Sequence, residues 1–521
     1  MKISWAEWGT PVTGGAGDLA GAQGLGRTDY ALLALLMLVF WCGVLRQIDL
    51  PGLYMDSVFP DYLAARALNP GLKNPVWALP TATVPILGGL YHGVQNLYVG
   101  MVVFVLLGIS VTSIRIAQAL FGAAIVILLY LLTYRITGRR AAAFVGALLL
   151  ATEIAFLASF RSQFYIILSA EAWLFASLVA LWRGGRIGHL LSGVFFGLAI
   201  YGYFVLGFFL PAIAILIMNR KDRQPLLWMA GIAAGLLPYV AGYASLVWAL
   251  GGPSNALAWL NETVRTLAPF SSKLGLSESL TGVWDRSLLA LTNAGNELML
   301  FGEVLGGGWS RGKAFAFVAV TLLAALACHR WRALCVALLP LAYVAVAAFF
   351  GSRLWAHHFV VLVPLSYLVL AVAIGLLPLR KPVAIGIAIV AGFFVVGNLH
   401  QSNRFHERLN ETGGARMASN ALSQFAEEAR RNRDTLYVFP EWGFFTSFAL
   451  LTENRIPYLL DASAITSARG TAERVVIAFW NDRDEEKYAS LLMQAGARET
   501  ATSVYRQRDG RPAFLVVSGR F

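Results

Sequence analysis

LYMDSVFPDYLAARALN (Leu53–Asn69) brings two carboxylates, Asp56 and Asp61, to the point where the first long apolar run of the chain has just ended. A carboxylate that stays ionised beside a membrane is able to accept a proton or to hold a cation. The competing interpretation is that Asp56 only caps a short amphipathic helix. The chain on either side of this stretch therefore decides between the two interpretations.

The stretch itself predicts a helix that begins near Pro60, because proline suits the first turn of a helix. Ser57 or Phe59 would then be the N-cap, and Asn69-Pro70-Gly71 would end the helix. Asp56 is expected at or just before this N-terminus, where the helix dipole and free backbone N–H groups favour an ionised carboxylate.

The composition is that of a membrane protein. Apolar residues make up 58% of the 521 residues, charged residues only 13%, and the mean hydropathy is +0.64. Apolar runs recur at lengths near the roughly 20 residues that cross a bilayer, which predicts a polytopic α-helical membrane protein. The net charge of +12 lies largely in short clusters between these runs, which indicates orientation in the membrane and no nucleic-acid partner. The three cysteines lie in or beside apolar runs and indicate neither a disulfide framework nor a metal cluster.

The positive clusters predict the sidedness of the spans. Eleven crossings, with the N-terminus in the cytoplasm, put all five Lys/Arg clusters on the cytoplasmic side. The predicted spans are Tyr30–Gln47, Thr112–Tyr134, Ala141–Ser159, Phe164–Trp182, His189–Ile200, Tyr203–Met218, Leu226–Leu250, Ala314–Cys328, Ala333–Gly351, Phe359–Leu379 and Val383–Leu399. The short apolar run Tyr98–Gly108 is expected to be an interfacial or re-entrant helix on the outer face.

These spans divide the chain into three regions. Residues 1–29 are expected to be a cytoplasmic tail, and residues 30–399 a transmembrane domain with large outer loops at 49–110 and 251–313. Residues 400–521 have the composition of a soluble domain, with alternating helix and strand patterns that predict an extracytoplasmic α/β domain. The large loops all lie outside, so the chemistry is expected there.

Basic side chains at the outer ends of spans form a candidate phosphate-binding set. These residues are Arg115, Arg161, Arg353, His357 and His358. Arginine can hold a phosphate with two parallel hydrogen bonds as negative charge grows on it. The competing interpretations are headgroup contact for each arginine, and interfacial packing or metal ligation for the two histidines.

Glu153 lies within the third predicted span, and an acid inside a membrane is a functional candidate by default. It precedes Arg161 by eight residues, which is roughly 12 Å along a helix, so it could border the outer cavity. We therefore take Glu153 and Asp61 as candidates for a second acid. A hydrogen-bonded carboxyl inside the bundle is the alternative for Glu153.

One long segment resembles a known family. SIRIAQALFGAAIVILLYLLTYRITGRRAAAFVGALLLAT (Ser113–Thr152), preceded by an outer loop that bears Asp56, resembles the GT-C superfamily of membrane glycosyltransferases. The resemblance is to the branch that contains protein O-mannosyltransferases and the aminoarabinose transferases that modify lipid A. It covers roughly the first 220 residues, and the later spans agree in layout.

The resemblance implies an inverting glycosyltransferase. The family carries an Asp-Glu pair in its first outer loop, and the matching positions here read Asp56-Ser57. Asp56 would then be the base that takes a proton from the acceptor hydroxyl, and the basic residues above would hold the phosphate of a polyprenyl-phosphate sugar donor. No motif in the sequence indicates a cofactor. The resemblance allows one cofactor, a divalent cation.

The resemblance also implies a location and partners. The protein is expected in the bacterial cytoplasmic (inner) membrane, with its active site and C-terminal domain in the periplasm. Its partners would be membrane lipid, the lipid-linked donor and an envelope acceptor that is a glycolipid, a polysaccharide or a protein. The alternatives are a transporter or flippase of lipid-linked sugars and a non-catalytic envelope assembly protein.

Overall fold

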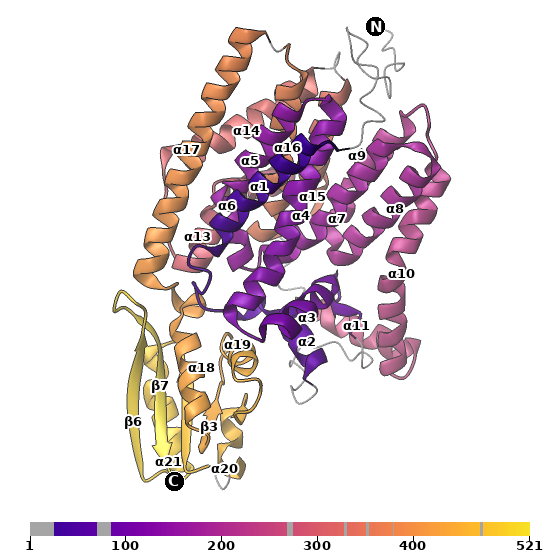
Figure 1. The fold of residues 1–521 in the computed structure, drawn as a ribbon. Coiled ribbons are helices and arrows are strands. Elements are labelled where there is room, and N and C mark those ends of the chain that lie inside the picture. The colour runs from indigo at the N-terminus through magenta and orange to yellow at the C-terminus, as the bar shows by residue number, and fades with distance from the viewer. Residues whose placement is uncertain are drawn as a thin grey trace.

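The structure is a computed structural model that describes residues 25–69, 85–267, 275–327, 331–350, 354–378, 380–468 and 472–521. A bundle of long helices forms most of the molecule, and a smaller domain with a β-sheet lies at one end of it (Figure 1). The predicted fold class, a polytopic helical membrane protein with a C-terminal α/β domain, is confirmed.

Eight helices of the described residues are long and apolar enough to cross a membrane. They are α1 (Arg27–Leu45), α4 (Val111–Thr137), α7 (Tyr165–Arg183), α10 (Pro225–Ala249), α14 (Gly308–Leu326), α15 (Trp331–Phe350), η7 with α16 (Ala356–Leu376) and α17 (Lys381–Thr412). A ninth span is broken: α5 (Arg140–Ala151) and the following segment of α6 (Ile154–Leu157) and η3 (Ala158–Arg161) meet at a bend of 58°.

The other two of the eleven predicted spans form helices that do not pass the same test of length and hydropathy. They are α8 (Gly185–Gly202) and the joined η4 (Phe204–Phe209) and α9 (Leu210–Met218). The run at Tyr98–Gly108 is α3 (Gln95–Leu107), which is too short to span, packs on α4 and exposes apolar side chains such as Leu106. Of the predicted tail, residues 1–24 lie outside the described residues, and α1 already begins at Arg27.

Glycines let α8 and α10 touch backbone to backbone. A Cβ atom on Gly193 would lie 2.1 Å from the carbonyl oxygen of Trp228, and one on Gly235 would lie 2.2 Å from the carbonyl oxygen of Val194. Small residues allow such close approach of helices where no hydrophobic effect drives them together. This contact fixes α10 against the bundle, and α10 in turn supports the outer loop described below.

The two large loops that were expected on the outer face fold into short elements at one end of the bundle. The first contains η2 (Met55–Ser57), α2 (Phe59–Leu68), β1 (Leu87–Gly89), β2 (His92–Gly93) and α3. The second contains α11 (Pro253–Leu267), α12 (Leu276–Leu291) and α13 (Ala294–Phe301). In Figure 1, α2, α3 and α11 lie at the end of the bundle that faces the C-terminal domain.

Helix α17 joins the membrane bundle to the C-terminal domain without a break. It has 32 residues, so the domain boundary expected between residues 399 and 400 falls inside a continuous helix. The buried residues of α17 begin at Asn398 and continue to Thr412, whereas the apolar half before them packs little against the bundle. In Figure 1, this helix runs along one side of the molecule.

The C-terminal domain is a five-stranded mixed sheet in the order β4-β3-β5-β7-β6. Strands β3, β4 and β5 are parallel, and β7 is antiparallel to both β5 and β6. The strands are β3 (Thr435–Val438), β4 (Tyr458–Leu459), β5 (Arg474–Phe479), β6 (Glu499–Arg506) and β7 (Pro512–Arg520). The helices are η8 (Arg416–Ala418), α18 (Ala421–Arg431), α19 (Phe445–Leu451), η9 (Ala462–Ala464), α20 (Ile465–Ala468), η11 (Asp482–Asp484) and α21 (Glu485–Gln494).

Candidate active site at the outer ends of the spans

Asp56 lies in the short turn η2, half-buried beside a tyrosine of the same turn. The Tyr54 hydroxyl donates a hydrogen bond of 2.6 Å to Asp56 Oδ2. Burial raises the pKa of the Asp56 carboxyl, and the hydrogen bond from Tyr54 opposes part of this rise. Asp56 lies just before the N-terminus of α2, as expected, but removal from water shifts its pKa in the direction that disfavours the ionised form.

Helix α2 begins where proline predicted it but is not capped as predicted. Its first residue is Phe59, with Pro60 in the first turn and Val58 as an N-cap that makes no side-chain bond. Ser57 instead donates to the Tyr54 carbonyl oxygen at 2.7 Å. Asp61 is in α2, but its side chain lies outside the described part of the structure.

A β-hairpin that the sequence did not reveal carries Tyr91 and packs against α2, the helix that follows Asp56. The turn between β1 and β2 is held by α10, because Tyr239 and Tyr243 both donate to the Leu90 carbonyl oxygen. Burial raises the pKa of Tyr91, and the negative charge of Asp56 adds to this rise. The glycines before and after Leu90-Tyr91-His92, at Gly88, Gly89 and Gly93, were the available sequence signal for a tight hairpin.

Aromatic and imidazole rings continue from Tyr91 into the bundle. Tyr91 packs against Tyr203 at 5.5 Å between ring centroids, and His92 stacks on the same tyrosine at 5.9 Å. Tyr203 in turn lies 3.1 Å, from its hydroxyl oxygen to Nε2, from His358. His357 and His358 are therefore connected through Tyr203 to the hairpin that carries Tyr91.

His358 is held by the backbone of Trp355, and His357 is contacted by Gln163 from the turn between η3 and α7 (Tyr165–Arg183). The Trp355 N–H donates to His358 Nδ1 at 2.8 Å, and His358 Nε2 faces the Tyr203 hydroxyl. Gln163 Nε2 lies 3.2 Å from His357 Nδ1. These contacts fix two imidazoles side by side, with ring centroids 4.1 Å apart.

Arg286 is a cation near this cluster that the sequence gave no reason to single out. It lies on α12, which packs on η7, and its positive charge acts on His358. Burial lowers the pKa of the Arg286 guanidinium, and Asp285 opposes this shift. In the sequence, Arg286 follows Asp285 and looks like the other charged residues of its loop, so nothing set it apart.

Arg115 and Arg161 do not point their guanidinium groups toward a phosphate site. Arg161 donates to the carbonyl oxygens of Val44, Arg46, Gln47 and Leu50. Arg115 donates to those of Leu50 and Pro51 at 2.6 and 2.8 Å. Both side chains are buried, and they hold the end of α1 and the loop that leads to Asp56. The prediction that they bind the donor phosphate therefore does not fit the structure, because backbone carbonyls already accept their hydrogen bonds.

Glu153 is also engaged away from the Asp56 turn. It is fully buried, and its two oxygens accept hydrogen bonds of 2.7 and 2.6 Å from Lys313 Nζ. The Tyr367 hydroxyl and the Ala155 N–H donate to the same carboxylate. None of these partners is among the described neighbours of Asp56, so Glu153 is a buried ion-pair residue that joins α6, α14 and α16.

The remaining predictions about this site stay open. Arg353 lies outside the described residues. Among the described residues, no three His, Cys, Asp or Glu side chains gather in a way that could hold a metal ion.

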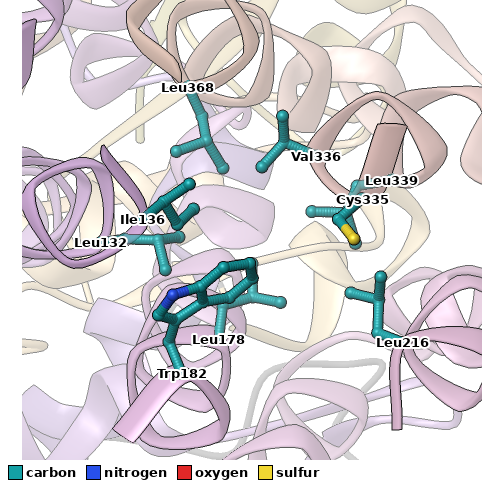
Figure 2. Close-up of a pocket in the computed structure, with 9 residues that line it drawn as sticks. All are labelled: Leu132, Ile136, Leu178, Trp182, Leu216, Cys335, Val336, Leu339 and Leu368. Carbon is teal, nitrogen blue, oxygen red and sulfur yellow. The ribbon is translucent and has the colours of Figure 1, made fainter. Parts of the chain in front are cut away.

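A separate apolar pocket lies between α4, α7, α9, α15 and α16 (Figure 2). It is lined by Leu132, Ile136, Leu178, Trp182, Leu216, Cys335, Val336, Leu339 and Leu368. No charged side chain lines it, so it offers no group to hold a phosphate or to move a proton. The polar cluster around Asp56 is therefore the better candidate for the active site.

Comparison with known proteins agrees with this architecture. The family model described as dolichyl-phosphate-mannose-protein mannosyltransferase matches residues 93–243. A search of curated protein sequences gives no match. Among solved structures, ArnT from Cupriavidus metallidurans bound to undecaprenyl phosphate aligns over 95% of this chain and 98% of its own, with a TM-score of 0.54 and 12% identity.

Two further structures are similar. The apo state of the same ArnT aligns over 94% of this chain and 97% of its own, with a TM-score of 0.53 and 13% identity. The Archaeoglobus fulgidus oligosaccharyltransferase tethered with an acceptor peptide aligns over 90% of this chain and 71% of its own, with a TM-score of 0.45 and 12% identity. The family match and the ArnT-like fold confirm the predicted resemblance to glycosyltransferases of the GT-C superfamily, and the chain carries their fold.

Proposed function

We propose that this protein is an inverting glycosyltransferase that moves a sugar from a polyprenyl-phosphate donor to an envelope acceptor at the outer face of the bacterial cytoplasmic membrane. The observation that carries the proposal is the half-buried Asp56 carboxylate, held by the Tyr54 hydroxyl in a turn just after the first span of an ArnT-like fold. ArnT was solved with undecaprenyl phosphate bound, which supports a polyprenyl-phosphate carrier here as well.

Asp56 is the proposed base. Its carboxylate takes the proton of the acceptor hydroxyl while that oxygen attacks the anomeric carbon of the sugar. The bond from this carbon to the phosphate oxygen breaks on the opposite face, so one displacement inverts the configuration. A base works best when its pKa approaches the working pH, and burial moves the pKa of Asp56 in that direction.

The leaving polyprenyl phosphate needs positive charge and hydrogen-bond donors. Arg286 and the His357-His358 pair supply these groups in the described part of the site. Arg353 remains in this proposal because it immediately precedes the segment that carries the two histidines. A lipid-linked donor would reach the cluster sideways from the bilayer, which suits a site at the ends of spans.

The first test is mass spectrometry of envelope glycolipids, polysaccharides and glycoproteins from cells that carry the wild type, a deletion or Asp56→Asn. We expect the same sugar to disappear from the same molecule in the deletion and in Asp56→Asn. Glu303→Gln is the matched control, since it also removes an outer-face carboxylate, one that only pairs with Arg408 at the surface. This control is expected to keep the sugar.

The same experiment separates the alternatives. A transporter or flippase would keep moving lipid in Asp56→Asn, and an assembly protein would show little change in that variant. If the deletion loses a sugar that Asp56→Asn retains, the proposal that Asp56 is the base fails. Asp61→Asn, measured beside it, tests whether the second acid of this stretch takes part.

A further inference from the structure

Met55, the residue between Tyr54 and Asp56, is inserted into the C-terminal domain. Its side chain is fully buried and belongs to the same hydrophobic cluster as Phe425, Phe444 and Phe448. Those aromatic residues lie on α18 and α19 and beside them, almost 400 residues further along the chain. The turn that carries the proposed base is thus attached directly to the core of another domain.

A second set of contacts joins the residues on either side of this turn to the same domain. Ser447 on α19 donates a hydrogen bond of 2.9 Å to the Leu53 carbonyl oxygen. Leu53 and Val58 share a buried cluster with Ala449 and Leu450 of the same helix region. A Cβ atom on Gly52 would lie 2.2 Å from the Ser419 carbonyl oxygen, so the two backbones touch there.

The membrane domain holds the other side of the turn. Gln118 on α4 approaches the Ser57 carbonyl oxygen at 3.4 Å. Residues 52–58 therefore lie between α4 and the C-terminal domain, and Asp56 is the charged residue at the centre of this contact. The position of its carboxylate depends on both domains at once.

We infer that Met55 is a positioning residue and that the C-terminal domain, through Met55 and Ser447, sets the place of the Asp56 carboxylate. This inference rests on the proposed function. A reacting group that is misplaced by about 1 Å can lose about a hundredfold in rate, so a change at Met55 should act on turnover rather than on donor binding.

The test compares Met55→Ala with Leu492→Ala in the full-length protein. Leu492 is equally buried in the C-terminal domain but belongs to a different cluster, so its variant controls for loss of domain stability. Hydrogen exchange of the amides of residues 53–58 and the steady-state constants for the donor are both measured. We expect faster exchange and at least a tenfold lower kcat in Met55→Ala, with KM nearly unchanged, and neither effect in Leu492→Ala.

Two further variants sharpen the result. Met55→Leu refills the volume with an apolar side chain and should restore most of kcat. Ser447→Ala removes only the bond to Leu53 and should lower kcat in the same direction. Unchanged kcat in Met55→Ala, or an equal loss in Leu492→Ala, would overturn the inference.

The outcomes also separate this inference from the proposed function. If Asp56→Asn is inactive and Met55→Ala is fully active, only the positioning role fails. If Asp56→Asn is active, the proposed base is wrong, whatever hydrogen exchange reports for residues 53–58. If the amides of residues 53–58 exchange at the same rate in Met55→Ala and in the wild type, the C-terminal domain does not hold the turn.

Discussion

Arg115 and Arg161 donate hydrogen bonds to the same oxygen, the carbonyl of Leu50. They come from different helical segments, and together they reach six hydrogen bonds to the end of α1 and the loop after it. This loop runs directly into the turn that carries Asp56. The two arginines therefore act on the proposed base through the backbone, as positioning residues.

We expect Arg161→Lys to unfold at a lower temperature and to leave the KM for the lipid donor unchanged. Lysine keeps the charge but lacks the planar fork that reaches several carbonyls at once. Hydrogen bonds to a charged group are each worth about 1.5–3 kcal/mol, so losing two or more should cost at least about 3 kcal/mol. Thermal unfolding in detergent and donor kinetics on the folded protein measure the two effects.

Arg286→Gln is expected to raise the KM for the lipid donor and to leave the stability of the protein nearly unchanged. Arg286 lies on α12, which packs on the η7 segment that carries His358, in the proposed phosphate site. Loss of about 1.4 kcal/mol of phosphate binding raises the donor KM about tenfold. The thermal midpoint should stay within a few degrees of the wild type. A raised donor KM in Arg161→Lys with normal stability would instead return the phosphate role to Arg161.

The pH dependence of kcat/KM should show an acid limb above the ordinary pKa of an aspartate, which is about 3.9. Burial raises the pKa of Asp56, and the protonated acid cannot accept a proton, so activity falls as the pH falls through this raised value. Tyr54→Phe removes the hydrogen bond that favours the carboxylate. Its acid limb is therefore expected at a still higher pH.

Tyr62→Phe is the control for this shift, because Tyr62 is a second buried tyrosine of the same loop and its hydroxyl interacts with Tyr458. It should change stability and leave the acid limb where the wild type has it. An acid limb that stays in place in Tyr54→Phe would contradict the assignment of Asp56 as the titrating base.

Features that depend on neighbouring residues were predictable from the sequence. The apolar runs, the short helix after Asp56 and the strands of the C-terminal domain follow from local patterns of side chains and from proline. Asp56 itself stood out because it is a carboxylate that comes soon after the first apolar span. The sequence also separated α3 from the true spans, since 13 residues are too few to cross a bilayer.

Pairings between distant residues were not predictable. Arg161 and Leu50 are 111 positions apart, and Glu153 and Lys313 are 160 apart, so no spacing rule connects them. An arginine at the end of a span suits a phosphate and a backbone carbonyl equally well, and only the fold decides which oxygen it meets. The contacts of Tyr203 with Tyr91 and His358 were equally unpredictable, because only the fold brings these three residues together.

Glu153→Gln and Lys313→Met should each destabilise the protein strongly. Each change leaves the other charge buried without its partner, which typically costs about 3–5 kcal/mol. The double variant removes both charges and is expected to recover much of this loss. A double-mutant cycle of thermal unfolding measures the coupling, and additive losses would contradict a direct interaction between the two side chains.

The glycine contact between α8 and α10 supports the hairpin that carries Tyr91, so a change there should reach the site. In Gly193→Ala the added methyl group meets the backbone of α10 at 2.1 Å, and one of the helices must shift. Because Tyr239 and Tyr243 on α10 hold the hairpin turn, we expect both a lower thermal midpoint and a lower kcat.

Gly392→Ala on α17 is the matched control, since nothing lies within 4 Å of the added atom and alanine favours a helix by about 1 kcal/mol. That variant should be at least as stable as the wild type and equally active. Equal behaviour of the two variants would mean that close packing of α8 on α10 contributes nothing to the position of Tyr91.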